Sequence, residues 1–190
     1  MSLAAHLVTD RLRYGISPAE LIDRTSRAAH GGVAVIQVRE RDLSAAALLD
    51  LVRGILRGAA GTPTKLLVND RVDVALAAGA HGVHLRSDSF PASRVRAIVP
   101  RGFIIGRAVH SLDDIDRATA EGGCDYLMFG TVFPSRGKPR DHACAGLEAL
   151  REACRRSPVP VIAIGGIDGA RLDDVARSGA AGFAAVGMFM

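Results

Sequence analysis

The chain has 190 residues but no tryptophan, only three cysteines and few other aromatic residues. Cys124, Cys144 and Cys154 match no metal-binding spacing, and their odd number argues against a disulfide framework. No apolar run approaches the roughly 20 residues of a membrane span, and the N-terminal segment lacks the basic region and apolar core of a signal peptide. These absences predict a soluble, cytoplasmic protein without membrane contact and without a zinc site.

What the chain does contain is a repeated unit, in which a short apolar run of strand type ends at a polar residue or glycine and a helix-like stretch follows. The runs lie at residues 6–10, 33–41, 65–70, 82–85, 103–110, 125–133, 160–166 and 182–187. Eight strands alternating with helices predict an α/β fold, a (β/α)8 TIM barrel that forms a single domain over residues 1–190. Ser17, Ser44 and Ser111 are expected to cap helices.

The predicted barrel lacks its final helix, because the eighth run leads directly into Met188, Phe189 and Met190. In a complete barrel a helix would cover the outer face of that strand. Either the chain is truncated, or a partner chain or a rearranged helix covers the face. We therefore expect a homo-oligomer.

Barrels of this kind carry their functional residues at the carboxyl ends of the strands. That rule selects Gln37, Arg39, Arg41, Asn69, Asp70, His84, Arg107, His110, Thr131, Lys138, Gly165, Gly166 and Gly187. Seven cations lie at or just after strand ends: Arg39, Arg41, Arg86, Arg107, Arg136, Lys138 and Arg140. Since the net charge is only +4 and no basic run is interleaved with aromatic residues, we expect a small anionic ligand, most simply a phosphate ester, and no nucleic acid.

The glycines after the last two strands, Gly165, Gly166 and Gly187, indicate a phosphate site. Glycine lets backbone N–H groups approach an anion closely, and these two loops bind phosphate in many barrels of this type. The alternative is that the glycines only make tight turns.

The polar strand ends also allow two interpretations each. Gln37, Arg39 and Arg41 alternate onto one face of a strand and suit pyrophosphate, unless the arginines pair with neighbouring glutamates. Asp70 could hold Mg²⁺ or cap the following helix. His84 lies between two apolar residues and is either catalytic or a hydrogen-bonded histidine of the barrel interior.

The motifs QVRER, ND, GVHL, GRAVHS, DYLMFGTVFPSRGKP, PVIAIGGI and GAAGFAAVG, in that order, resemble the thiamine-phosphate synthase and TenI superfamily from His6 to Gly187. Synthases of this family join hydroxymethylpyrimidine pyrophosphate to thiazole phosphate with Mg²⁺. Relatives of the TenI type include an aromatase that tautomerises a thiazole carboxylate phosphate.

The resemblance also implies roles for individual residues. Gln37, Arg39, Asn69 and Lys138 would hold the pyrimidine and its pyrophosphate, Asp70 would bind Mg²⁺, and Gly165, Gly166, Val186 and Gly187 would hold the thiazole phosphate. We expect Arg41 and Ser135 to contact substrate as well. The expected catalytic residues are Arg39, Lys138, His84 and Thr131.

Departures from the synthase pattern favour the TenI branch. Arg41 replaces a lysine, Ser89 stands at the second metal-ligand position with Asp88 one residue early, Ala108 replaces a serine, and Gly137 replaces a threonine. The TenI pattern has a gap too, because its catalytic histidine corresponds to Thr131 here. A proton shuttle would then come from His84 or from His142.

The leading hypothesis is a TenI-like enzyme of thiamine biosynthesis that acts on a thiazole phosphate by proton transfer and has no certain cofactor. The first alternative is a thiamine-phosphate synthase that uses Mg²⁺. A second is a non-catalytic paralogue that binds a phosphorylated thiazole or pyrimidine.

Overall fold

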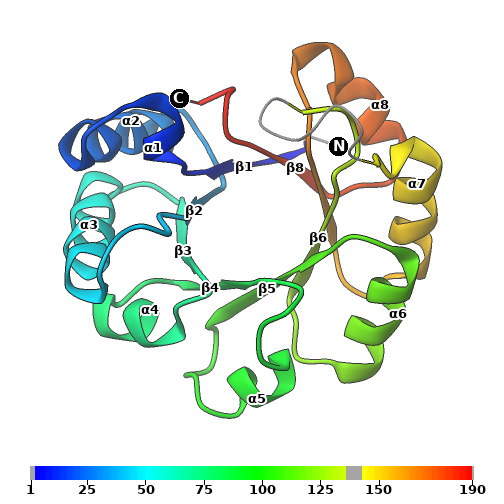
Figure 1. The fold of residues 1–190 in the computed structure, drawn as a ribbon, viewed down its shortest axis with the longest axis horizontal. Helices are drawn as coiled ribbons and strands as arrows, with labels where there is room; N and C mark the ends of the chain where they lie inside the picture. The colour runs from blue at the N-terminus through cyan, green and yellow to red at the C-terminus, as the bar shows by residue number, and fades with distance from the viewer. Residues whose placement is uncertain (1–2, 136–142, 190) are drawn as a thin grey trace.

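The structure is a computed structural model that describes residues 3–135 and 143–189. Eight parallel strands close into a barrel, and their order around it follows the chain from β1 to β8 (Figure 1). The strands are β1 (Ala4–Val8), β2 (Val35–Val38), β3 (Lys65–Asn69), β4 (Gly82–Leu85), β5 (Ile104–Val109), β6 (Tyr126–Phe129), β7 (Val161–Ile164) and β8 (Gly182–Ala185). The predicted (β/α)8 architecture is therefore confirmed.

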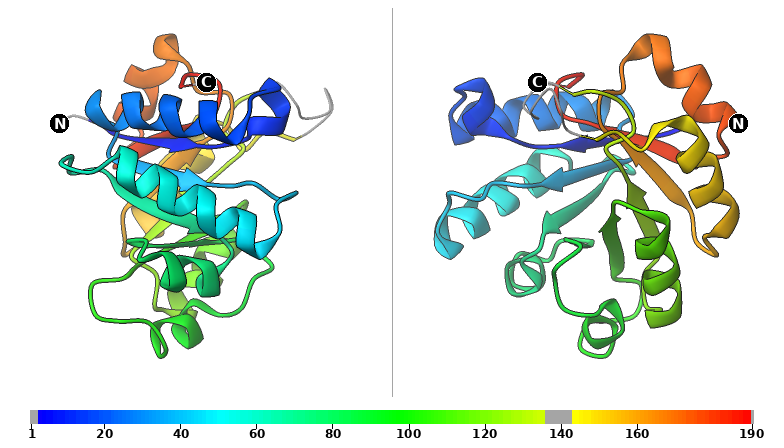
Figure 2. Two further views of the ribbon diagram at one scale, coloured as in Figure 1. Left: turned by 90° about the vertical axis from the view of Figure 1, so that its left-hand side faces the viewer. Right: turned by 45° about the vertical axis from the view of Figure 1, so that its right-hand side comes forward.

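The helices form a ring around the barrel (Figures 1 and 2). They are α1 (Arg11–Tyr14), α2 (Pro18–His30), α3 (Ala45–Gly58), α4 (Val72–Ala78), α5 (Ala92–Arg96), α6 (Leu112–Glu121), α7 (Gly146–Arg156), the 3₁₀ helix η1 (Gly169–Arg171) and α8 (Leu172–Arg177). Ser17, Ser44 and Ser111 cap α2, α3 and α6 as predicted, because each side chain accepts a backbone N–H three residues on. None of the helices within the described residues is long and apolar enough to cross a membrane.

Several strands end earlier than the apolar runs that predict them. β2 stops at Val38, the last residue in register with β3, although the run extends to Arg41. The backbone N–H of Arg39 donates instead to the Thr9 hydroxyl oxygen at 2.9 Å. A side chain of the neighbouring β1 loop thus replaces the strand ladder, which no periodicity in the sequence reveals.

Two layers of apolar side chains form the core. Inside the barrel lie Val8, Leu67, Tyr126, Met128, Ile162 and Ala184. Larger clusters fill the space between the strands and the helix ring. Strands buried on both faces need nearly continuous apolar runs, which is the pattern that the sequence shows.

The outer side of β8 is covered by the chain itself. No helix follows β8 within the described residues up to Phe189. Phe183 and Ala185 on that strand are nevertheless buried, and the Phe183 ring stacks on that of Phe189 with centroids 6.5 Å apart. The uncovered strand that suggested a partner chain is thus absent, and the homo-oligomer stays a prediction.

Candidate functional site

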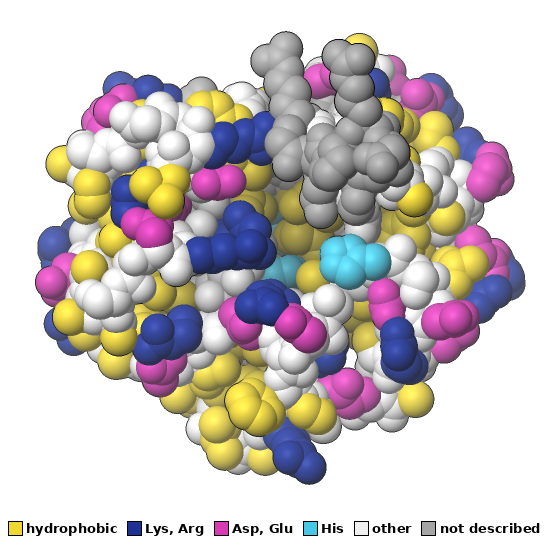
Figure 3. All heavy atoms as spheres, in the orientation of Figure 1, with side chains coloured by type: hydrophobic (Ala, Val, Ile, Leu, Met, Phe, Trp, Pro, Cys, Tyr) yellow, Lys and Arg dark blue, Asp and Glu magenta, His cyan; other side chains and the backbone are white. Residues whose placement is uncertain are grey.

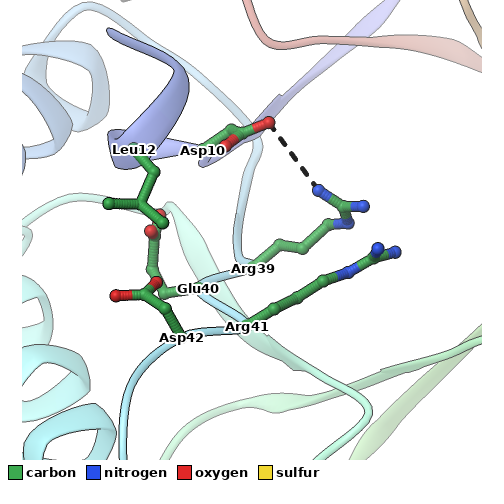
Figure 4. A pocket seen from close by; sticks show the side chains of 6 residues that line it. All are labelled: Asp10, Leu12, Arg39, Glu40, Arg41 and Asp42. Carbon is green, nitrogen blue, oxygen red and sulfur yellow. Dashed lines mark ion pairs between the residues drawn. The ribbon is translucent and has the colours of Figure 1, made fainter. Parts of the chain in front are cut away.

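The predicted alternation of charge in QVRER is found, but in the loop that follows β2. Figure 4 shows Arg39 and Arg41 pointing to one side, away from Glu40 and Asp42. A pocket of about 400 Å³ lies here, lined by Asp10, Leu12, Arg39, Glu40, Arg41 and Asp42. The buried Glu40 carboxylate accepts the backbone N–H of Arg11 at 3.2 Å and fixes the loop from the opposite side. The ion-pair partner of Glu40 is Arg11, whose Nε lies 3.7 Å from Oε2, while Arg39 and Arg41 point away from it.

The guanidinium of Arg39 lies near other charged side chains, Asp10 and Arg41 among them. Its Nη1 lies 3.9 Å from the nearer carboxylate oxygen of Asp10. Burial and the positive charge of Arg41 lower the pKa of Arg39, and the opposite effect of Asp10 and Glu40 does not offset them. Arg41 is exposed and has no hydrogen bond or ion pair with the part of the chain that the structure describes. Both cations are thus placed to take an external anion.

Asp70 follows β3 and is tied to the loop after β4. Its backbone has a positive φ of 63°, and its N–H donates to the carbonyl of His84 at 2.9 Å. The Ser89 hydroxyl donates to Oδ1 of Asp70, and Oδ2 lies 3.9 Å from Nη1 of Arg86. Both carboxylate oxygens of Asp70 therefore face protein partners.

The surroundings of Asp70 do not fit the Mg²⁺ site that the sequence resemblance implies. Mg²⁺ favours carboxylate oxygens whose charge is uncompensated. Here the second ligand position is the Ser89 hydroxyl, and the carboxylate one residue before it, Asp88, pairs with Arg86 at an exposed position. Within residues 3–135 and 143–189, no three His, Cys, Asp or Glu side chains gather as a metal site would require.

Arg107 is occupied by a structural role that its position at a strand end did not indicate. Its guanidinium donates to the carbonyls of Ser87 and Phe90, both at 3.1 Å, and lies 3.5 Å from Glu121. Arg107 thus clamps the loop that carries Arg86 and Ser89. It has to be removed from the set of seven predicted anion-binding cations.

Histidines and a tyrosine occupy the barrel interior. His84 Nδ1 lies 2.9 Å from the Tyr126 hydroxyl, and the His6 ring meets the Tyr126 ring edge-on at 5.6 Å. Burial, with a further contribution from His6, lowers the pKa of His84 to about 3, so the imidazole is neutral. This environment favours the structural interpretation of His84 over the catalytic one. Sequence reasoning missed Tyr126 and His6; the glycine at position 106, opposite the tyrosine ring, was the available signal.

Gln37 and Asn69 form an amide pair across β2 and β3. Gln37 Nε2 donates to Asn69 Oδ1 at 2.8 Å. Gln37 Oε1 is buried and has no hydrogen-bond partner among the described residues. A buried carbonyl oxygen without a partner is a position that a ligand donor group can satisfy.

His110 lies beside the position where the TenI pattern expects its histidine. Its Nδ1 donates to the carbonyl oxygen of Gly130 at 2.6 Å. Gly130 is the residue immediately before Thr131. Since a carbonyl only accepts, Nδ1 is the donor in this bond, and Nε2 is the nitrogen of the exposed ring that remains to exchange a proton. A histidine after β5 thus reaches the end of β6.

The paired glycines after β7 are required by close packing. A Cβ on Gly165 would lie 2.5 Å from Cγ2 of Thr131, and one on Gly166 would lie 2.3 Å from the Pro134 carbonyl oxygen. Both glycines have positive φ. A Cβ on Gly187, after β8, would lie 2.9 Å from the Tyr14 hydroxyl, and Val186 beside it is half-buried. The tight-turn interpretation therefore holds for the first two, and it does not conflict with phosphate binding by their N–H groups.

Some predicted residues lie outside the described part of the chain. They are Arg136, Gly137, Lys138, Arg140 and His142. Ser135 is described and half-buried. In the space-filling view, Lys and Arg side chains border the central hollow on one side, over an apolar floor (Figure 3). Cations thus border the mouth of the barrel, and the binding of a small anion there stays a prediction.

Comparisons with known proteins agree with this geometry. Residues 5–189 match the protein family described as "Thiamine monophosphate synthase". A thiamine-phosphate synthase from Anaeromyxobacter dehalogenans is 41% identical over 89% of this chain and 74% of its own length. The synthase from Roseiflexus castenholzii is 39% identical over 95% and 78%.

A solved structure agrees as well. Thiamine phosphate pyrophosphorylase from Pyrococcus furiosus superposes with a TM-score of 0.84 at 32% identity, covering 97% of this chain and 85% of that one. Sequence, fold and the charged barrel mouth lead to the same conclusion: the chain belongs to the thiamine-phosphate synthase family.

Proposed function

We propose that the chain is a thiamine-phosphate synthase, a transferase that joins hydroxymethylpyrimidine pyrophosphate to thiazole phosphate. The observation that carries this proposal is the pair of guanidiniums, Arg39 and Arg41, directed together from the end of β2. The names of relatives 39–41% identical to the chain support it better than they support the tautomerase. Both the synthase and the tautomerase reaction belong to thiamine biosynthesis.

In the proposed reaction the thiazole displaces pyrophosphate from the pyrimidine methylene group, and the leaving group takes the bonding electrons. Arg39 and Arg41 stabilise the negative charge that develops on the pyrophosphate. The free Oε1 of Gln37, held by Asn69, accepts a hydrogen bond from the pyrimidine. Backbone N–H groups at Gly165, Gly166, Val186 and Gly187 hold the thiazole phosphate. Lys138 and Ser135 complete the pyrophosphate contacts, as the family resemblance implies.

The test is an incubation with both substrates that measures thiamine phosphate and released pyrophosphate. Arg39→Gln should lower kcat/KM by about 100-fold, since removal of one charge-stabilising donor typically costs about 2.7–4 kcal/mol. Arg27→Gln, at an exposed position of α2, removes a cation elsewhere and should leave the rate unchanged. A folded wild-type chain that makes no thiamine phosphate would contradict the proposal.

A second candidate is tautomerisation of a thiazole carboxylate phosphate, and His110 is the observation that favours it. His110 follows β5, and its Nδ1 donates to the carbonyl of Gly130, the residue before Thr131. A proton-transfer enzyme that uses this base should lose its isomerase activity in His110→Asn, which keeps a polar side chain but removes the imidazole. Isomerisation followed by NMR separates this candidate from the synthase. Ligand-dependent thermal stabilisation without either turnover would identify a binding paralogue.

A further inference from the structure

We propose that the side chain of Arg86 supplies the positive charge that a bound metal ion would otherwise bring to the pyrophosphate. This site then binds pyrophosphate without a divalent cation. The inference deepens the proposed synthase function and rests on it for the identity of the ligand. It assigns to one of the seven cations at the strand ends a specific role, that of replacing a metal ion.

The position of Arg86 is the first argument. Its Nη1 lies 3.9 Å from Oδ2 of Asp70, so the guanidinium faces the carboxylate that would have to ligate a metal. A cation there opposes the binding of a second cation through simple Coulomb repulsion. The same charge attracts a phosphate group that approaches Asp70 from the barrel mouth.

Ser89 provides the second argument, because it holds this arrangement in place. Its oxygen accepts the backbone N–H of Arg86 at 2.9 Å, while its hydroxyl donates to Asp70. One hydroxyl therefore links the cation-bearing loop to the carboxylate. A carboxylate at position 89 could not donate this bond and would repel Asp70. The serine that removes a metal ligand is thus also the residue that positions Arg86.

The third argument is that Arg86 acts together with the two arginines after β2. Arg86 is close enough to Arg39 to contribute to lowering the pKa of Arg39, after burial and Arg41, and against the opposite effect of Asp10 and Glu40. The carboxylates near these arginines, Asp10 and Asp70, lie as far as 3.9 Å from them, so the guanidiniums keep N–H groups for a further anion. Pyrophosphate carries enough negative charge to satisfy three guanidiniums, which bind phosphate oxygens in a bidentate manner.

Arg86 is also available to a ligand. The carboxylate that accepts a hydrogen bond from Arg86, Asp88, is an exposed side chain on the same loop, and exposed ion pairs of this kind are weak. Asp88 can swing into solvent when a phosphate replaces it. The loop backbone does not need to move, because Arg107 holds the carbonyls of Ser87 and Phe90.

The experiment is a calorimetric titration of the full chain with inorganic pyrophosphate, in EDTA and again with excess Mg²⁺. The wild-type affinity should agree within about threefold between the two conditions. In EDTA, Arg86→Gln should weaken binding at least about 10-fold, as expected for loss of a charge-assisted contact. Arg86→Lys, which keeps the charge, should recover part of that loss. Mg²⁺ tightening wild-type binding 10-fold or more would overturn the proposal.

Arg117→Gln is the matched control, because Arg117 is an exposed arginine of α6 that also pairs with a nearby aspartate. Its affinity for pyrophosphate should equal that of the wild type, and thermal unfolding of each variant verifies that it folds. Equal weakening by Arg117→Gln and Arg86→Gln would reduce the effect to net charge and overturn a site at Arg86.

The two proposals fail in different ways. Metal-free pyrophosphate binding without thiamine phosphate formation would remove the synthase and leave the arginine site. Thiamine phosphate formation that depends on Mg²⁺, together with Mg²⁺-dependent pyrophosphate binding, would keep the synthase and remove the arginine site.

Discussion

Gly106 shows how a single missing side chain decides what the barrel interior contains. A Cβ at this position would lie 2.1 Å from Cζ of Tyr126, so the ring occupies the space that glycine leaves open. Gly106→Ala should therefore destabilise the fold by about 1–3 kcal/mol through overpacking. Urea unfolding measures this, with Gly169→Ala as control, because a Cβ there meets no heavy atom within 4 Å. Equal stabilities of the two variants would show that the ring moves freely and would contradict the proposed fit.

At the scale of the element, the conformation of the loop after β4 depends on Arg107, an arginine of β5 whose side chain is largely buried. Arg107 donates to two carbonyls of this loop and pairs with Glu121 of α6. Arg107→Met keeps most of the apolar stem but leaves those carbonyls without the donor. Backbone amides of residues 86–91 should then exchange hydrogen at least about 10-fold faster, corresponding to about 1.4 kcal/mol. Mass-spectrometric hydrogen exchange measures this; unchanged exchange in that loop would mean that Arg107 does not hold it.

At the scale of the whole molecule, neutral histidines inside the barrel make its stability depend on pH. Burial lowers the pKa of His6 to about 4 and that of His84 to about 3, whereas the unfolded chain has ordinary histidines with a pKa near 6.5. The unfolded state therefore binds protons first, and the stability present above pH 6.5 is lost as the pH falls toward 4. Each histidine contributes a slope of up to about 1.4 kcal/mol per pH unit.

Urea unfolding between pH 7.5 and pH 5 measures this slope. His84→Gln should flatten it, because one of the buried titrating groups is then gone. Substitution of the exposed His30 by glutamine serves as the control and should keep the wild-type slope. Identical slopes in all three proteins would place the acid sensitivity elsewhere.

The sequence by itself determined the barrel, the order of its strands, the helix caps and the end at which the charged residues gather. These features depend on short-range patterns: apolar runs long enough for strands buried on both faces, glycines or polar residues at their ends, and serines before helices. The family membership also followed from motif order along the chain.

The tertiary structure alone decided which of the cations at the strand ends are free to bind a ligand. Arg107 and Arg86 look alike in sequence, yet one clamps a loop while the other faces Asp70. Asp70 and Ser89 are 19 residues apart and meet only because parallel strands end at the same rim. Hydrogen bonds and ion pairs of this kind depend on the distance between atoms in space, and a local sequence pattern does not determine that distance.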